Sequence, residues 1–179
     1  MFETLVKLNC FSRNKMLKIL AKNLLEKLYG CEINCTEIDK SVLFAHHARG
    51  CTIVASKICE DVVIYQNVTI GSNMRYNKIN DEWENIGSPI ICKNVVIGDG
   101  AKIVGPIIIG ENSVVAAGAI ITKDIPANSI IYGVNKFKPK DANYDLIFNS
   151  NMVDFRKIIE ANNKLIEKYN QLMSRAVDV

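Results

Sequence analysis

The 179-residue sequence predicts an all-β solenoid core flanked by short helical segments, and two interlocking series of residues carry this prediction. Large aliphatic residues, all Ile or Val, recur at multiples of six in two blocks: Ile58, Ile64, Ile70, Ile91, Ile97, Ile103, Ile109, Val115 and Ile121. Smaller residues on average follow four positions behind: Val62, Val68, Val95, Ala101, Ile107, Ser113, Ala119 and Ile125. A period of six fits neither a helix nor simple strand alternation, and it is typical of a hexapeptide-repeat solenoid.

Composition is consistent with one folded domain and excludes several classes of protein. Hydrophobic residues make up 49% of the chain, which excludes intrinsic disorder as the main state. The net charge of +3 comes without a dense Lys/Arg cluster, so we expect no nucleic-acid partner. No apolar run reaches the about 18 residues of a membrane span, and the first fifteen residues make a poor secretory signal, so we expect a cytoplasmic protein.

Residues 1–34 are predicted to form an N-terminal helical segment. An apolar stripe with helical spacing precedes Gly30, a typical helix terminator: Met16, Leu17, Leu20, Leu24 and Leu28. Six basic residues face two acidic residues over the first thirty positions. We expect the stripe to pack on the rest of the protein, and the alternative is contact with an anionic membrane surface.

Residues 35–140 are predicted to form the solenoid. Three hexads complete one coil of a triangular prism, with the Ile/Val series pointing inward from flat walls and the smaller series filling the corners. Backbone groups of successive coils then pair into three parallel sheets, whose walls suit β-branched side chains. Gly71, Gly98 and Gly110 directly follow inward-pointing Ile residues, and we expect a tight turn there that disfavours bulk.

The register breaks once, between Ile70 and Ile91. The intervening segment is polar, and we expect residues 72–89 to form a protruding loop that leaves the stack intact. This loop holds the only tryptophan, Trp83, for which we expect a role in the functional site or at a subunit boundary. The alternative is that Trp83 only anchors the loop.

Residues 141–179 are predicted to return to helix. Their apolar and part-polar positions alternate at three and four residues, a heptad-type seam: Met152, Phe155, Ile159, Asn162, Ile166, Tyr169 and Met173. We expect this helix to pack on the solenoid or to make a short contact between subunits.

Candidate acid–base chemistry is concentrated at two adjacent histidines, His46 and His47. Histidine is the natural general base near neutral pH, because its unperturbed pKa lies there. A catalytic zinc site needs three protein ligands, and the single close cysteine pair, Cys31 and Cys35, is a weak metal signature, so we expect no metal. The six cysteines are expected to be reduced structural thiols.

Three segments carry a resemblance to a known family. His47-Ala48-Arg49-Gly50, the run Gln66–Gly71 and Thr122-Lys123-Asp124-Ile125-Pro126 resemble the hexapeptide-repeat acyltransferases, and most closely the serine acetyltransferase branch. The resemblance implies a left-handed parallel β-helix, a homotrimer with active sites between neighbouring prisms, and acetyl-CoA as co-substrate.

The resemblance also implies residue roles. His47 would remove the acceptor hydroxyl proton during direct attack on the thioester, without a covalent acyl-enzyme. The expected acetyl-CoA contacts are Asp99, Ala117, Gly118, Thr122, Lys123 and Lys140. The expected acceptor contacts are His46, Asn67 and Trp83.

Departures from the serine acetyltransferase pattern shape the expected acceptor. His46 replaces the aspartate that precedes the catalytic histidine in that branch, and Ser88 replaces a second histidine. We therefore expect an O-acetyltransferase that modifies a sugar hydroxyl of a cell-surface glycan. The alternatives are a serine O-acetyltransferase of cysteine biosynthesis and a non-catalytic trimeric scaffold.

Overall fold

The computed structural model describes residues 1–72, 74–79, 81–85, 87–141, 163–164 and 166–167. The chain divides into two compact units, Met1–Tyr144 and Asp145–Val179. In the second unit residues 163–164 and 166–167 are helical, and the rest of the heptad-type seam predicted for 141–179 lies outside the described residues. Everything that follows concerns the first unit.

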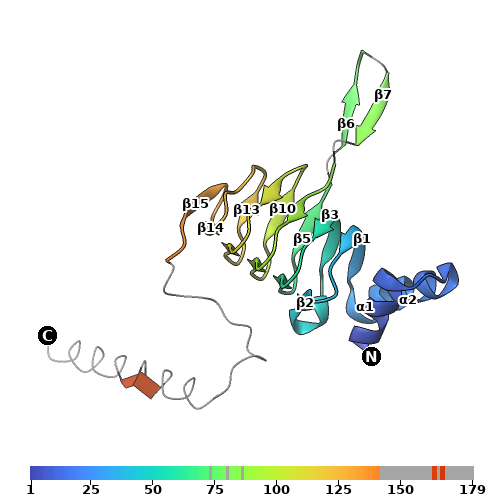
Figure 1. The fold of residues 1–179 in the computed structure, drawn as a ribbon, viewed down its shortest axis with the longest axis horizontal. Coiled ribbons are helices and arrows are strands. Elements are labelled where there is room, and N and C mark those ends of the chain that lie inside the picture. The colour runs from blue at the N-terminus through green and yellow to red at the C-terminus, as the bar shows by residue number, and fades with distance from the viewer. Residues whose placement is uncertain (73, 80, 86, 142–162, 165, 168–179) are drawn as a thin grey trace, which may run out of the picture. The chain divides into compact units, whose positions relative to one another are not determined.

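The solenoid is a triangular prism of stacked parallel coils with the left-handed β-helix fold (Figure 1). Wall 1 contains β5 (Thr69–Gly71), β10 (Lys102–Val104) and β13 (Ile120–Ile121); wall 2 contains β8 (Ile90–Ile91) and β11 (Ile108–Ile109). Wall 3 contains β2 (Leu43–Phe44), β4 (Val63–Ile64), β9 (Val96–Ile97), β12 (Val114–Val115) and β14 (Ser129–Tyr132), and ends with antiparallel β15 (Lys136–Pro139).

The three predicted sheets are two hydrogen-bonded sheets in the structure. Strand β3 (Thr52–Ile58) pairs with β5 through its first residues and with β8 through its last, so it runs round a corner from wall 1 to wall 2. Strand β1 (Glu32–Ile38) lies in parallel register beneath β3 along this whole path. Walls 1 and 2 are therefore joined at the first two coils.

Both predicted series point into the prism. Every member is buried, and the most exposed, Ile107, has a relative exposure of only 6%. Members of one wall stack directly, as in the column formed by Ile53, Ile70, Ile103 and Ile121. The hexapeptide interpretation of the sequence is confirmed.

Two of the three glycines have a different role from the tight turn predicted for them. A Cβ atom on Gly98 would lie 2.7 Å from the backbone nitrogen of Ala117 in the next coil, and at Gly110 the approach of Ala127 is closer still. Glycine is required there because the neighbouring coil passes too close for a side chain. A Cβ atom on Gly71 would meet only Thr69 Cγ2 at 4.0 Å, an ordinary van der Waals contact.

Asparagine provides the left-handed turns on the edge between walls 2 and 3. Asn94, Asn112 and Asn128 have φ values of 53°, 56° and 56°, a region that Asn tolerates better than most residues. The Nδ2 group of Asn94 donates to Oδ1 of Asn112 at 2.9 Å, and Nδ2 of Asn112 donates to Oδ1 of Asn128. This side-chain ladder links three successive coils.

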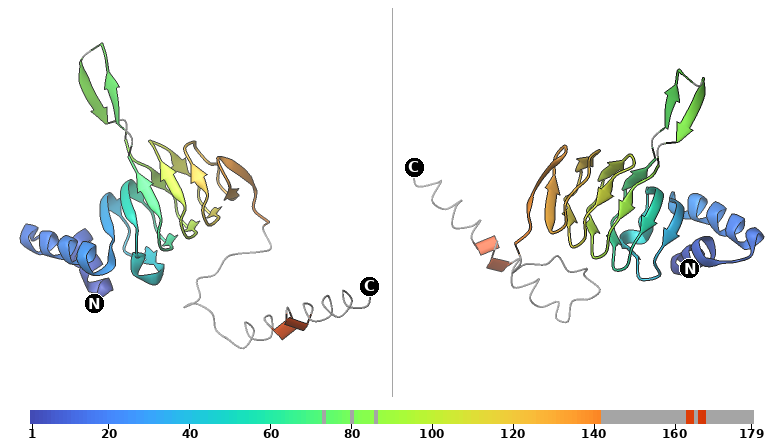
Figure 2. Two further views of the ribbon diagram at one scale, coloured as in Figure 1. Left: turned by 180° about the vertical axis from the view of Figure 1, so that it is seen from behind. Right: turned by 45° about the horizontal axis from the view of Figure 1, so that its top comes forward.

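The predicted loop is a β-hairpin that projects from the prism (Figures 1 and 2). Strands β6 (Met74–Asn77) and β7 (Glu82–Asn85) pair antiparallel, with Trp83 opposite Tyr76. Across the hairpin Ile70 stacks on Ile103, 33 residues later, whereas Ile103 stacks on Ile121, 18 residues later. The insertion therefore leaves the coil register intact.

Two helices precede the first coil. Helix α2 (Lys15–Tyr29) begins at Asn14, whose side chain accepts hydrogen bonds from the backbone N–H groups of Met16 and Leu17, and it ends at Gly30 with φ 61°. Helix α1 (Phe2–Phe11) lies within the predicted helical segment 1–34, ahead of the apolar stripe on which that prediction rested, and it buries Phe2, Leu5 and Val6. Among the described residues, no helix has the length and apolarity needed to cross a membrane.

The predicted packing of the apolar stripe of α2 is wrong. Met16, Leu17, Leu20 and Leu28 have relative exposures of 75%, 40%, 56% and 52%. The buried residues of α2 are instead Ala21 and Leu25. The small side chain of Ala21 allows the helix to approach closely on a different side, which leaves the stripe uncovered.

Candidate functional site

One edge of the prism carries most of the predicted site residues. We call the corner between walls 3 and 1 the histidine edge; it comprises residues 45–51, 65–68, 98–101 and 116–119. Its coils are joined by backbone hydrogen bonds from Asn67 N to Arg49 O at 2.8 Å, Gly100 N to Gln66 O at 3.1 Å and Gly118 N to Asp99 O at 2.8 Å. The edge thus aligns the following residues along the prism: His46, His47, Asn67, Asp99, Ala117 and Gly118.

Both histidines project from a turn with unusual backbone geometry. His46, His47 and Ala48 have φ values of 51°, 59° and 50°, so three consecutive non-glycine residues are left-handed. This conformation costs about 1–2 kcal/mol per residue, and such strain concentrates at functional sites. Ala48 is fully buried while both histidines are exposed, so the turn anchors itself inside the prism and directs the two histidines outward.

Aromatic contacts position the His47 ring. Its centroid lies 5.3 Å from that of Phe2 in an edge-to-face arrangement and 5.7 Å from that of Tyr29. Within the described residues neither histidine pairs with a carboxylate, and His46 instead lies 6.1 Å from the Tyr65 ring. The two N-terminal helices therefore supply the groups that orient the candidate base.

A polar network continues along the histidine edge above the turn. Asn67 Nδ2 donates to Asp99 Oδ1 at 3.0 Å, and Lys102 Nζ donates to Asn67 O at 3.1 Å and to Thr69 Oγ1 at 3.0 Å. Sequence reasoning missed Lys102, because an exposed lysine at an outward position of a hexad has no distinguishing signal. Gly50 is needed beneath this network: its φ is 68°, and a Cβ atom there would lie 2.5 Å from Asn67 Oδ1.

The other predicted contacts lie on different edges. Thr122 and Lys123 occupy the corner between walls 1 and 2, from which the hairpin with Trp83 also emerges. Asn135 engages Thr122 twice, at 2.8 Å from its backbone nitrogen and at 2.9 Å from its hydroxyl. Lys140 lies on the edge between walls 2 and 3, where its Nζ group donates to Oδ1 of Asn112, a member of the asparagine ladder, at 2.7 Å. A single chain thus distributes the expected acetyl-CoA contacts over three edges.

Burial keeps the cysteine thiols protonated near neutral pH. It raises the pKa of Cys31 to about 11 and that of Cys35 to about 12. Cys51, at the base of the histidine edge, is buried with its Sγ 3.2 Å from Tyr65 O, and burial raises its pKa as well. A raised thiol pKa disfavours the nucleophilic thiolate, so this geometry favours a base-assisted direct transfer over a cysteine acyl-enzyme. Among the described residues, no group of three or more His, Cys, Asp or Glu side chains could hold a metal ion.

Comparisons with known proteins agree with this geometry. Residues 88–123 match the bacterial transferase hexapeptide family, described by six repeats. A putative serine acetyltransferase of Schizosaccharomyces pombe is 36% identical over 121 residues, which cover 67% of this chain and 42% of the relative. The serine acetyltransferase of Mycobacterium tuberculosis is 35% identical over 109 residues, which cover 60% and 44%. The chain therefore spans less than half the length of these relatives.

Solved structures lead to the same group of proteins. The Neisseria gonorrhoeae serine acetyltransferase in complex with serine matches with a TM-score of 0.54 at 26% identity, covering 70% of this chain and 48% of that one. A serine acetyltransferase in complex with CoA matches with a TM-score of 0.52 at 27% identity, covering 67% and 47%.

These findings correct the expected acceptor. The similar proteins are serine acetyltransferases, so the expectation of a sugar hydroxyl in a cell-surface glycan, drawn from the departures at His46 and Ser88, is wrong. Both departures concern single side chains beside an otherwise matching repeat, and they do not define a sugar site. The chain is a left-handed β-helix built from the bacterial transferase hexapeptide repeat, and its relatives are serine acetyltransferases.

Proposed function

We propose that this chain transfers the acetyl group of acetyl-CoA to the hydroxyl of serine, with His47 as the general base. Its similarity to serine acetyltransferases supports the acceptor and the co-substrate. The observation that carries the proposal is the alignment of His47 with Asn67, Asp99 and Gly118 along the histidine edge. This alignment places a base beside open positions of the next coils.

The proposed chemistry needs one base and no covalent intermediate. His47 accepts the hydroxyl proton as the serine oxygen bonds to the acetyl carbon, and it returns the proton to the departing sulfur as the carbon–sulfur bond breaks. Phe2 and Tyr29 hold the imidazole ring during both transfers. His46 and Asn67 are proposed to contact the acceptor from the same edge.

The upper part of the histidine edge fits an extended thioester. Ala117 and Gly118 are small and exposed, and a Cβ atom added to Gly118 would meet nothing within 4 Å. A chain-like group can therefore lie along these coils without a steric clash. We assign Asp99, Ala117 and Gly118 of one subunit to this part of acetyl-CoA.

A neighbouring copy would bring Lys140 to this edge. Outward residues of wall 3 form an aliphatic column in register: Leu43, Val63, Val96, Val114 and Ile130. The outward row of wall 1, by comparison, contains the polar residues Thr52, Thr69 and Lys102. We propose that wall 3 packs against its neighbours in a homotrimer, in which Lys140, on the edge between walls 2 and 3, faces the histidine edge of another subunit. Thr122, Lys123 and the hairpin that carries Trp83 lie at the corner opposite wall 3, so this packing does not bring them to that edge.

Acetyl-CoA binding and serine acetylation test the proposal separately. Titration calorimetry is expected to give one acetyl-CoA per chain, and mixing with L-serine is expected to release the free CoA thiol. A panel of sugars serves as the control and is expected to release none. Acetyl-CoA binding without acetylation of serine would contradict the acceptor, and absence of binding at millimolar acetyl-CoA would favour the non-catalytic scaffold.

A further inference from the structure

We propose that helix α2 docks on an anionic lipid surface through its apolar stripe, which comprises Met16, Leu17, Leu20, Leu24 and Leu28. This interaction is independent of the chemistry proposed for the histidine edge. It accounts for an exposed helix face that the fold itself leaves uncovered.

Helix geometry gathers the stripe on one side of α2. With about 100° of rotation per residue, its five residues fall within an arc of about 120°. Four of the five are 40% or more exposed, and Leu24 is partly buried against the core. Ala21 and Leu25, the buried residues, lie just outside this arc, next to the Leu28 end of it. Figures 1 and 2 show α2 beside the first coil, at the end of the prism away from β14 and β15.

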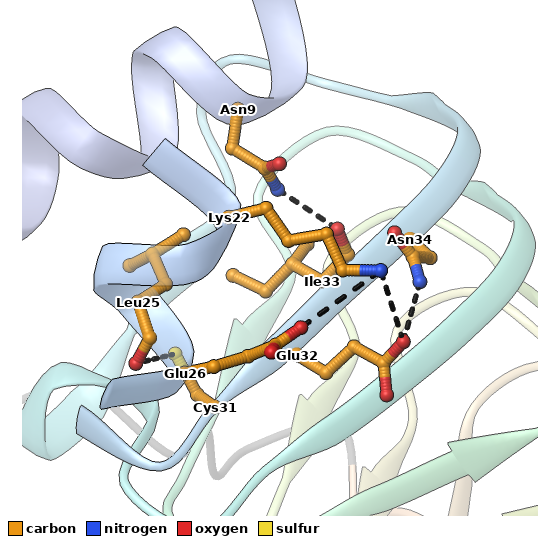
Figure 3. A network of polar contacts seen from close by, with 8 residues as sticks. All are labelled: Asn9, Lys22, Leu25, Glu26, Cys31, Glu32, Ile33 and Asn34. Carbon is orange, nitrogen blue, oxygen red and sulfur yellow. Dashed lines mark hydrogen bonds and ion pairs between the residues drawn. The ribbon is translucent and has the colours of Figure 1, made fainter. Parts of the chain in front are cut away.

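The lysines of α2 determine which partner fits: in helical projection Lys15 and Lys18 lie on the face opposite the stripe, and Lys27 lies within its arc. Among the described residues no acidic group pairs with Lys15, Lys18 or Lys27. Lys22 is partly neutralised, because it lies 3.8 Å from Glu26 and 3.6 Å from Glu32 (Figure 3). A helix with one apolar side and unpaired lysines is suited to the interface of an anionic bilayer.

The same charges argue against a second copy of the chain as the occupant. Pairing two α2 helices through their stripes would bring their Lys27 side chains, which lie within the stripe's arc, into a shared apolar contact and add like-charge repulsion. Nucleic acid would satisfy the lysines but would leave the leucines and Met16 in water. An anionic bilayer satisfies both the charged and the apolar groups.

The stripe cannot be covered by a simple rotation of α2 onto the prism. Asn9 Nδ2 donates to Ile33 O at 2.8 Å, and Lys22 links α2 to Glu32 of β1 (Figure 3). Ala21 and Leu25 are each only 1% exposed. Turning the stripe inward would break the Lys22–Glu32 contact and expose both buried residues, and the Asn9–Ile33 bond independently fixes α1 to β1. The helix is therefore held ready to bind with its apolar side outward.

Vesicle cosedimentation of the full chain tests the proposal. Vesicles of phosphatidylcholine with one third phosphatidylglycerol are expected to sediment the protein, whereas vesicles of phosphatidylcholine alone are expected to leave most of it in solution. The variant M16Q/L20Q is expected to bind the anionic vesicles at least about tenfold more weakly. The variant K15Q/K27Q is expected to lose about twentyfold, and raised salt should weaken wild-type binding similarly.

The matched control is I79Q/V134Q, which makes the same kind of apolar-to-amide change at two exposed positions away from α2. It is expected to bind like the wild type. All substituted side chains are exposed, so every variant is expected to keep the fold. Thermal unfolding of each variant checks this. Absence of wild-type binding to anionic vesicles, or equal binding by M16Q/L20Q, would overturn the proposal. Lipid-free association that M16Q/L20Q abolishes, without vesicle binding, would assign the stripe to a second copy and would also overturn it.

Discussion

His47 owes its position to the backbone of its turn and to two aromatic side chains far from it in sequence. The left-handed conformation of His46, His47 and Ala48 directs the histidines outward, and Phe2 and Tyr29 pack against the ring of His47. A candidate base can thus be oriented in this chain by packing, where a carboxylate partner is absent among the described residues.

The two histidines are expected to differ in their effect on catalysis. His47→Ala should lower kcat for serine acetylation by about 10²- to 10⁴-fold, the loss expected when a general base is removed. His46→Ala is the matched control and should lose less, because His46 has no part in the proton transfer. Steady-state kinetics of both variants checks this expectation. Equal losses, or an inactive His46 variant beside an active His47 variant, would overturn the assignment.

A second prediction at the residue scale concerns alkaline stability. Burial raises the pKa of Cys35 from its ordinary 9.0 to about 12, so the folded protein keeps this thiol protonated while the unfolded chain loses the proton first. The free energy of unfolding should therefore be unaffected by this thiol below pH 9 and should fall as the pH rises from 9 towards 12.

Urea unfolding of Cys35→Ala at several pH values checks this expectation. The variant should show a shallower alkaline decline than the wild type, whatever its stability at neutral pH. Cys59→Ala is the matched control, because the pKa of Cys59 is raised less. Identical slopes for the wild type and Cys35→Ala would contradict the prediction.

At the scale of the elements, the coils are held by inward columns, by the asparagine ladder and by close backbone approach. Gly110→Ala should lower the free energy of unfolding by about 2–3 kcal/mol, because the new Cβ atom would overlap the backbone at Ala127 and force the coils apart. Gly71→Ala is the control, because its Cβ atom would make only an ordinary contact with Thr69 Cγ2 at 4.0 Å, and it should change stability by less than about 0.5 kcal/mol. Denaturant titrations measure both, and equal stability of the two variants would contradict the role assigned to Gly110.

The hairpin illustrates how an element can be added to this fold at little structural cost. Among the described residues its strands pair with each other and with no strand of the prism, and the columns on both sides of the insertion continue in register. Since the coil hydrogen bonds do not pass through the hairpin, its length and sequence can vary without changing the prism. The role proposed for Trp83 therefore concerns the functional site and not the stability of the fold.

At the scale of the whole molecule, the proposed homotrimer depends on the aliphatic column of wall 3. Val114→Lys would place a charge in the middle of that column and is expected to convert the trimer to monomers, since burying an unpaired ammonium is strongly unfavourable. Ile108→Lys makes a comparable change on the outward row of wall 2 and is expected to leave the trimer intact. Sedimentation velocity of both variants distinguishes these outcomes.

Activity then tests whether the site requires more than one subunit. The monomeric Val114→Lys variant is expected to lose serine acetylation, because Lys140 could no longer reach the histidine edge of a neighbour. A monomeric wild type, or a fully active monomeric variant, would contradict a site shared between subunits.

The sequence predicted the prism because its repeat is a local property. Each inward Ile or Val has the same environment as its equivalent one coil away, so a period of six is sufficient to assign wall and corner. Helix α2 was predicted for a similar reason, since Gly30 and the spacing of its leucines are local signals. The location of His46, His47 and Asn67 on one edge of the prism follows from the same register.

Only the tertiary structure decided which surfaces are covered. The spacing of Met16, Leu20 and Leu28 makes a helix but does not say which side faces the core, and the close packing of Ala21 leaves the stripe exposed. The contact of His47 with Phe2 joins residues 45 positions apart, and the need for glycine at Gly110 depends on a coil that arrives only when the prism is stacked. Repeats therefore specify this fold through local periodicity, whereas exposure, ring contacts and shared edges depend on which distant segments meet in space.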